Sequence, residues 1–326
     1  MFLIKNNSND GVIYWEGVIM DKLNQAYFDW WYGLEENFRK ILLITLYDNP
    51  EYEVDFYNLK RTTYTDLKQP EDLLKIFELK HICYMNDIPS RPEYTLTKAP
   101  SFEFFHNLEC IEIVQCDLED LSGFQTAQQV KRISVHENWI SDNQQLQYFN
   151  GLTELEELDL SFNAFTDLSA LNNLPNLKEI CIYGHYEDVD ISSLINFPKL
   201  ENIEMDTATG ITILGQLKQL KSLDYGSDER EFDCSKIEWL TEQLPHCKFD
   251  FCLPSEQWIE QGLSDLNFLY CLALRGLKKE NVKLYIPPFV NEVNRFKELE
   301  NKYRNNNEIY PLVCRTRQYV CQDKEP

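Results

Sequence analysis

Residues 151–177 have the sequence GLTELEELDLSFNAFTDLSALNNLPNL, which carries a regular apolar pattern. Leu155, Leu158, Leu160 and Asn163 form the pattern LxxLxLxxN, and further apolar residues follow at mostly helical spacing. The LxL part predicts a short strand, and the asparagine predicts a turn whose backbone groups it can satisfy. One such unit cannot bury its apolar edge alone, so the pattern predicts that several units stack side by side.

The same frame recurs along the chain, beginning at residues 108, 130, 155, 177, 200 and 220. The intervals lie within or close to the period of about 20 to 29 residues that is typical of leucine-rich repeats. Weaker copies precede these six, as Ile41-Ile44-Leu46-Asn49 and Leu79-Ile82-Tyr84-Asp87. The repeats therefore predict an array that is clear from about residue 100 to 250 and that begins near residue 38.

Residues 152–174 resemble the class of about 22 residues found in internalins and in phosphatase-regulator leucine-rich-repeat proteins. The resemblance covers about residues 100 to 250. It implies an α/β fold, namely a leucine-rich-repeat solenoid with a curved parallel β-sheet on its concave face. Because this family has many unrelated binding roles, the resemblance predicts the fold far more specifically than the function.

The ends of the chain lack the repeat, so the sequence predicts three parts. Residues 1–37 predict an N-terminal cap, with a hairpin around Asn7–Gly11 and an amphipathic helix around residues 22–31. Residues 38–252 form the predicted solenoid, which ends in an edge strand at residues 244–251. Residues 253–326 predict a C-terminal helical segment, with a helix within 255–281, whose start at Ser255 resembles a capping box, and a second helix over 290–303.

The composition limits the classes of partner. The chain has 326 residues, 31 basic and 54 acidic, and a formal net charge of −23. This charge opposes binding to nucleic acid and to anionic membranes, and it favours a basic protein partner. In the alternative interpretation, the net negative charge only keeps the protein soluble. No apolar run approaches the roughly 20 residues of a membrane span and no secretion signal is recognisable, so a cytoplasmic protein is expected.

No motif predicts a cofactor, a metal site or a catalytic site. The ten cysteines contain no CxxC pair, so most are expected to be reduced and buried. The five histidines lie in separate units, and no phosphate loop, nucleophile elbow or HExxH motif is present. Cys321-Gln-Asp323 matches the Cys-x-Asp site of some bacterial leucine-rich-repeat ubiquitin ligases, but a tail of about 70 residues is too short for that domain. The sequence therefore predicts that the chain is not an enzyme.

The repeat frame also predicts which side chains line the concave sheet. The third, fifth, seventh and eighth positions of LxxLxLxxN should point away from the core. These positions hold many carboxylates and a small aromatic cluster, and strands about 4.8 Å apart place the charges within the Debye length of about 8 Å. The candidate partner-binding residues are Glu112, His136, Glu137, Glu157, Asp159, Phe162, Glu179, Tyr183, Glu204, Asp206 and Asp224. In the alternative interpretation these are ordinary polar strand positions facing water, and Phe162 and Tyr183 pack across strands.

Three hypotheses of function remain open. The first is an inhibitor that covers the basic active surface of a toxin or nuclease, as a bacterial immunity protein would. The second is an adaptor or regulatory subunit that docks an enzyme without inhibiting it. The third is a hydrolase or ligase in the C-terminal segment, which would require Cys321 or His246 for turnover.

Overall fold

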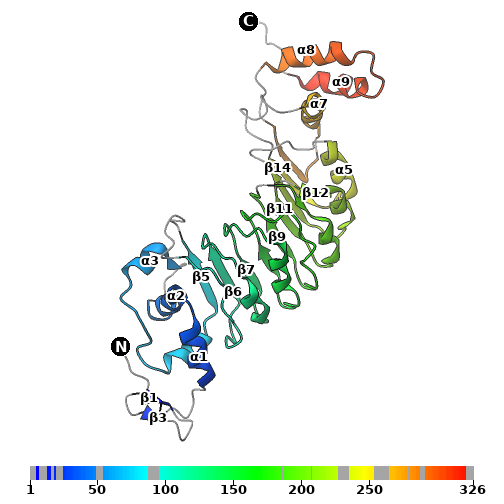
Figure 1. Ribbon diagram of the computed structural model, residues 1–326. Coiled ribbons are helices and arrows are strands. Elements are labelled where there is room, and N and C mark those ends of the chain that lie inside the picture. Colours follow the sequence, from blue (N-terminus) through cyan, green and yellow to red (C-terminus); the bar gives the residue numbers. More distant parts are fainter. Residues whose placement is uncertain are drawn as a thin grey trace. The chain divides into compact units, whose positions relative to one another are not determined.

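The computed structural model describes residues 5–6, 13–15, 18–19, 25–48, 54–86, 95–185, 187–206, 208–226, 235–252, 264–277, 279–286 and 291–320. The chain forms two compact units, one of residues 1–163 with 170–176 and one of 164–169 with 177–326. Ten parallel strands are divided between them, five in each unit, with helices beside them (Figure 1). The predicted boundaries of the solenoid, between residues 37 and 38 and between residues 252 and 253, remain predictions.

The parallel strands of the first unit follow the predicted frame. Ile111, Ile133 and Leu158 are register partners on three successive strands, and each is at most 1% exposed. The strands are β4 (Val54–Asp55), β5 (His81–Met85), β6 (Cys110–Val114), β7 (Arg132–Ser134) and β8 (Glu157–Asp159). The weaker copy that begins at Leu79 is confirmed by β5, in which Ile82 and Tyr84 are fully buried.

The weaker copy at residues 41–49 was predicted wrongly. Ile41 and Ile44 lie in helix α2 (Glu36–Tyr47), where Leu42 and Leu43 are buried as well. Four consecutive buried residues fit a helix that packs on more than one side, whereas a strand would alternate. The spacing i, i+3 is common to a helix and to the repeat consensus, which explains the error.

The predicted N-terminal hairpin and helix are both present. Strands β1 (Lys5–Asn6) and β2 (Ile13–Trp15) pair antiparallel, and β3 (Val18–Ile19) adds a third strand. Helix α1 (Gln25–Gly33) corresponds to the predicted helix, whose first residues 22–24 lie outside the described residues. The Trp31 indole donates to Asp66. The unit also contains α3 (Phe56–Arg61), α4 (Asp72–Phe77) and the 3-10 helices η2 (Ser122–Thr126) and η3 (Asn143–Phe149).

An asparagine ladder closes the turns after β7 and β8. The Asn163 amide nitrogen donates to the carbonyls of Val135, Leu160 and Ser161, at 2.9, 2.9 and 3.2 Å. Its oxygen accepts from the backbone of Asn138 and Ile140. Asn138 repeats the arrangement one turn earlier, where its oxygen accepts from the backbone of Cys116 and Leu118. The predicted role of the ninth position is therefore confirmed for both asparagines.

A line of phenylalanines fills the side of the first unit opposite the strands' outward face. Phe102, Phe124 and Phe149 come from successive return segments, and their ring centroids are 5.6 and 5.3 Å apart. All three are fully buried. Rings of this size supply much of the apolar area that stacking removes from water.

The second unit continues the pattern with five parallel strands, which Figure 1 shows in green to orange. They are β9 (Glu179–Ile182), β11 (Asn202–Met205), β13 (Ser222–Gly226), β14 (Lys248–Cys252) and β15 (Val282–Tyr285). The predicted strand at 244–251 exists as β14. It is not the edge of the sheet, because β14 pairs with β13 on one side and with β15 on the other. A smaller parallel pair joins β10 (Val189–Asp190) to β12 (Ala208–Thr209).

Helices accompany the strands of this unit and follow them in the chain. The 3-10 helices η4 (Ser192–Asn196) and η5 (Ile211–Gln216) lie in return segments, and α5 (Ser235–Gln243) contacts η5. The C-terminal part contains α7 (Asp265–Leu274), α8 (Glu292–Tyr303), α9 (Tyr310–Thr316) and the 3-10 turn η6 (Arg317–Tyr319). The two predicted C-terminal helices correspond to α7 and α8. The predicted capping box at Ser255 lies outside the described residues.

The observed elements confirm an α/β fold built from stacked repeats with parallel strands. The leucine-rich-repeat solenoid, its curvature and the capping roles of its ends remain predictions. Among the described residues, no helix is long and apolar enough to cross a bilayer.

Candidate functional site

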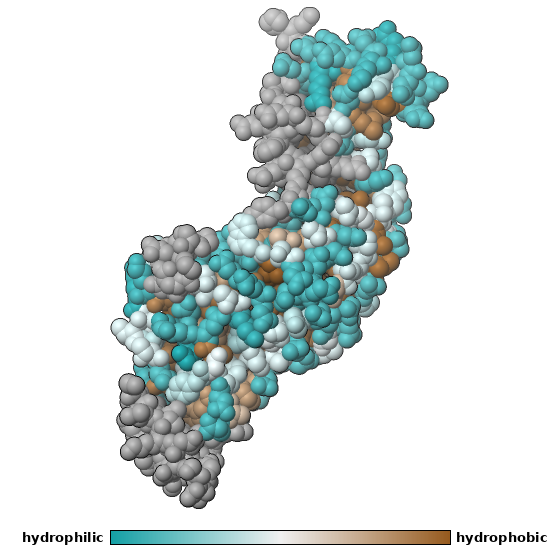
Figure 2. Space-filling model, viewed as in Figure 1, coloured by the Kyte–Doolittle hydropathy of each residue, from teal (hydrophilic) through white to brown (hydrophobic). Residues whose placement is uncertain are grey.

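The third and fifth repeat positions lie on the sheet face that points away from the core. Glu112, Glu157 and Glu179 are half-buried there, and Glu204 and Asp224 are exposed. The seventh position departs from the prediction in part, because Val114, Ser161 and Gly226 are buried. The other seventh-position residues, His136, Tyr183 and Asp206, are half-buried. Figure 2 shows that hydrophilic residues predominate on the visible surface of the described parts, with hydrophobic residues in scattered patches.

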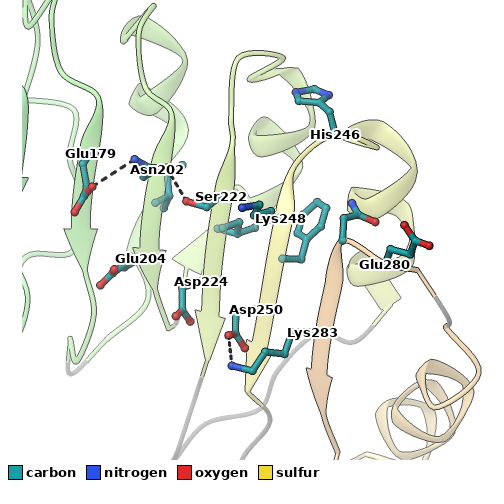
Figure 3. Close-up of a pocket in the computed structure, with 14 residues that line it drawn as sticks. Glu179, Asn202, Glu204, Ser222, Asp224, His246, Lys248, Asp250, Glu280 and Lys283 are labelled. Carbon is teal, nitrogen blue, oxygen red and sulfur yellow. Dashed lines mark hydrogen bonds and ion pairs between the residues drawn. The ribbon is translucent and has the colours of Figure 1, made fainter.

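An open hollow of about 810 Å³ lies on this face of the second unit. Figure 3 shows side chains from successive strands that line it. At one level, Glu179 contacts Asn202 at 3.4 Å, and the Ser222 hydroxyl donates to Asn202 at 2.7 Å. These contacts link the third-position side chains of β9, β11 and β13 across the hollow.

Three carboxylates lie at one level across neighbouring strands of the hollow. Glu204, Asp224 and Asp250 are consecutive register partners on β11, β13 and β14 (Figure 3). Lys283 on β15 forms an ion pair with Asp250 at the end of this acidic row. Although Asp224 is exposed, partial desolvation by the neighbouring strands, together with the charges of Asp250 and Glu204, raises its pKa against the opposing effect of Lys283. The row therefore concentrates negative charge that one lysine offsets only in part.

The other predicted residues of the second unit have distinct surroundings. Asp206 accepts a hydrogen bond from the backbone of Gly184 at 2.9 Å, which gives its carboxylate a structural role at the turn. Tyr183 is half-buried. His246, named in the hydrolase hypothesis, lies at the rim of the hollow beside the strand that carries Lys248 (Figure 3).

In the first unit, an arginine compensates two of the predicted carboxylates. Arg132 Nη2 lies 3.2 Å from Glu112 Oε1, and its Nε lies 3.7 Å from Glu157 Oε2. These contacts join the outward positions of β6, β7 and β8. The mutual repulsion expected from the sequence is therefore weaker here than the count of carboxylates implies.

His136 makes a second local charge arrangement. Its Nδ1 lies 3.7 Å from Asp159 and its Nε2 lies 3.6 Å from Glu137. The interaction with Asp159 raises the pKa of His136 even though burial opposes the increase. Burial raises the pKa of Asp159, but hydrogen bonds from His136, Ser161 and Ser134 outweigh it and hold this pKa below its ordinary value. The structure thus brings His136, Glu137, Asp159 and Phe162 together, since the Phe162 ring lies 5.0 Å from the imidazole.

The eighth repeat position has a left-handed backbone that the sequence did not predict. Gln115, Glu137 and Phe162 have φ values of 56°, 55° and 53°, and Gly184 at the same position has 73°. This conformation is strained for a bulky residue, so Phe162 costs roughly 1 to 3 kcal/mol of backbone energy. Phe162 is nevertheless 39% exposed. An exposed aromatic held at a strained position is a reasonable candidate anchor for a partner.

The sequence did not predict several exposed or hollow-lining residues. Trp139 follows the ladder residue Asn138, has a φ of 61° and is 51% exposed. Lys248, Asp250 and Lys283 line the hollow but lie on strands without the repeat consensus. The alternation Lys248-Phe249-Asp250-Phe251 would have assigned two of them to the outward face by its period of two. No comparable sequence signal distinguishes Trp139.

Three of the described cysteines have raised pKa values. Burial raises the pKa of the Cys116 and Cys247 thiols, the latter to about 12. A hydrogen bond with Cys110, followed by burial and the charge of Glu112, raises the pKa of Cys83. Thiols with raised pKa values are protonated at neutral pH and are poor nucleophiles. Cys321 lies outside the described residues.

The chain is similar to solved structures at low sequence identity. No family model and no curated protein matches the chain. Among solved structures, internalin C2 from Listeria monocytogenes is similar with 16% identity and a TM-score of 0.45, covering 62% of this chain and 84% of that one. A chain of the octameric complex of Latrophilin 3, Unc5D and FLRT2 (LRR) has 18% identity and a TM-score of 0.38, covering 57% of this chain and 66% of that one. The assignment of the repeats therefore rests on the ladder and the register described above.

Proposed function

We propose that this protein binds another protein through the outward face of its parallel strands, and that the partner is basic. The finer proposal is an inhibitor, such as a bacterial immunity protein, that covers the cationic active surface of a toxin or nuclease. The observation that carries the proposal is the acidic row of Glu204, Asp224 and Asp250 in the hollow of the second unit.

Electrostatics supports a cationic partner at this row. Among the described residues, no basic side chain forms an ion pair with Glu204 or Asp224. Partial desolvation and the repulsion from Asp250 and Glu204 raise the pKa of Asp224. A lysine or arginine entering the hollow would relieve that repulsion and gain charge-assisted hydrogen bonds. An acidic surface also steers a basic partner and raises the association rate at low salt.

A second candidate function is an adaptor that docks an enzyme and leaves it active. Phe162 and Trp139 favour it as much as inhibition, because exposed aromatics serve as anchors at interfaces of either kind. The two functions predict the same contacts and differ in the activity of the bound partner.

The test is charge reversal in the hollow. The double variant Glu204→Lys with Asp224→Lys should reduce retention of a basic partner from native lysate by about tenfold or more, because like charges would then face each other. Retention by the wild type should fall as salt rises. An activity assay of the captured protein, free and bound, then separates inhibition from adaptor function.

A matched control is Glu187→Lys with Glu242→Lys, which makes the same change of net charge at exposed positions of the same unit outside the hollow. The control should retain the partner like the wild type. Equal loss in both variants would mean that only net charge matters, and equal retention in both would refute binding through the acidic row.

A further inference from the structure

Two cysteines and a glutamate come together on the outward face of the first unit. Cys83 on β5 is the register partner of Glu112 on β6, and Cys110 lies two residues before Glu112 on the same strand. All three side chains therefore leave the same face of the sheet. The two sulfur atoms and a carboxylate oxygen lie within 4.8 Å of one another.

The spacing of these atoms is close to that of a tetrahedral metal site. With zinc–sulfur bonds of about 2.3 Å and zinc–oxygen bonds of about 2.1 Å, adjacent ligand atoms lie about 3.5 to 3.8 Å apart. The Cys110 sulfur lies 3.7 Å from Glu112 Oε1. Small side-chain rotations would bring all three groups into that range without movement of the paired strands.

The donor set selects the class of ion. Binding of a cation would displace the protons of both thiols to solvent. The resulting two thiolates and one carboxylate favour a borderline or soft cation such as Zn²⁺, whereas Mg²⁺ and Ca²⁺ prefer oxygen ligands alone. Three protein ligands leave a fourth position for water or for a group of a partner. Arg132, which pairs with Glu112, also contacts Glu157, so it has an alternative partner when Glu112 turns toward a cation.

We propose that Cys83, Cys110 and Glu112 form a binding site for one divalent cation of the Zn²⁺ class. The site does not depend on the proposed partner or on the acidic row. It departs from the expectation that the chain binds no metal, an expectation based on sequence spacing. The two cysteines are 27 positions apart in the chain, and only the pairing of β5 with β6 makes them neighbours.

The second unit provides a matched control. Glu179, Cys181 and Glu204 also place one ligand atom each within 4.8 Å of the others, but this group has a single thiol. Cys181→Ser removes that thiol on the same face of the sheet in another repeat. It should leave metal binding at the two-cysteine site unchanged.

The experiment uses Co²⁺ as a probe on the full-length chain kept reduced. The wild type should bind about one equivalent and show the intense thiolate-to-cobalt charge-transfer absorption of a site with two cysteines, and Zn²⁺ should abolish this band. Cys83→Ser and Cys110→Ser should each lose at least half of the band, and the double variant should lose all of it. Cys181→Ser should keep it, and millimolar Mg²⁺ should not displace the cobalt.

Glu112→Gln retains both thiols and is a second variant in case the serine substitutions disturb folding. It should weaken Zn²⁺ binding, measured by competition with a chromogenic chelator, while the circular dichroism spectrum stays that of the wild type. The proposal is overturned if the wild type shows no charge-transfer band, if the band persists in the Cys83/Cys110 double variant, or if Glu112→Gln binds Zn²⁺ as tightly as the wild type.

Discussion

Asn163→Ala is expected to destabilise the first unit by about 3 kcal/mol or more, because it removes the partner of five backbone groups at once. Asn163 is fully buried, so water cannot replace the lost hydrogen bonds without opening the turn. Each buried carbonyl or N–H left unpaired costs roughly 1 to 3 kcal/mol.

Two measurements check this prediction. Denaturant unfolding of the full-length chain should show a lower midpoint for the transition of the first unit. Hydrogen exchange should accelerate at the amides of Asn138 and Ile140, which the Asn163 oxygen accepts from. Asn172→Ala, at an exposed position of the same unit, should change stability by less than about 0.5 kcal/mol. Unchanged exchange at Asn138 in the Asn163 variant would contradict the ladder.

The ladder also explains why much of the fold was predictable from sequence. A buried asparagine at a fixed distance from the strand destabilises the fold unless all of its amide donors and acceptors form hydrogen bonds. Few backbone arrangements satisfy that condition for the pattern LxxLxLxxN. The apolar positions Leu155, Leu158 and Leu160 are at most 1% exposed, as the frame requires. Local pattern and tertiary contact therefore specify the same arrangement in the central repeats.

The errors occurred where the local pattern fits two structures. Ile41 and Ile44 satisfy both the repeat and a buried helix, and the contacts of α2 with β4 and β5 decide the outcome. Strand β15 was missed because Val282 and Leu284 carry only a short alternation after a helix, and pairing with β14 stabilises it. Tertiary contacts of this kind are not encoded in a short window of sequence.

The candidate site was predictable as a face but not as a distribution of charge. The frame placed Glu112, Glu157 and Glu204 on the outward side correctly. It could not show that Arg132 contacts the first two, whereas no described basic side chain pairs with Glu204. These ion pairs depend on which side chains extend across to a neighbouring strand, and the repeat pattern does not specify that. The acidic row could therefore be located only from the structure.

Glu292→Ala is expected to destabilise the C-terminal helices by about 3 kcal/mol, because it leaves the charge of Arg275 without its carboxylate partner in a largely buried position. Arg275 Nη1 lies 2.7 Å from Glu292, and their side chains are 17% and 3% exposed. Arg275 follows the last residue of α7 and Glu292 begins α8, so each charge also complements a helix dipole. Arg275 further donates to the carbonyl of Tyr319, which ties η6 to both helices.

Hydrogen exchange of the amides in α7, α8 and α9 measures this effect without requiring two-state unfolding of the whole chain. Glu238→Ala breaks the exposed ion pair with Arg315 in the same unit. It should change the free energy of opening, derived from hydrogen exchange, by less than about 1 kcal/mol. The double variant Arg275→Met with Glu292→Leu should recover most of the loss, since the main penalty is an unpaired buried charge. If the double variant is as unstable as Glu292→Ala, the pair instead contributes specific hydrogen bonds that apolar packing cannot replace, and the C-terminal helices depend on it for their arrangement.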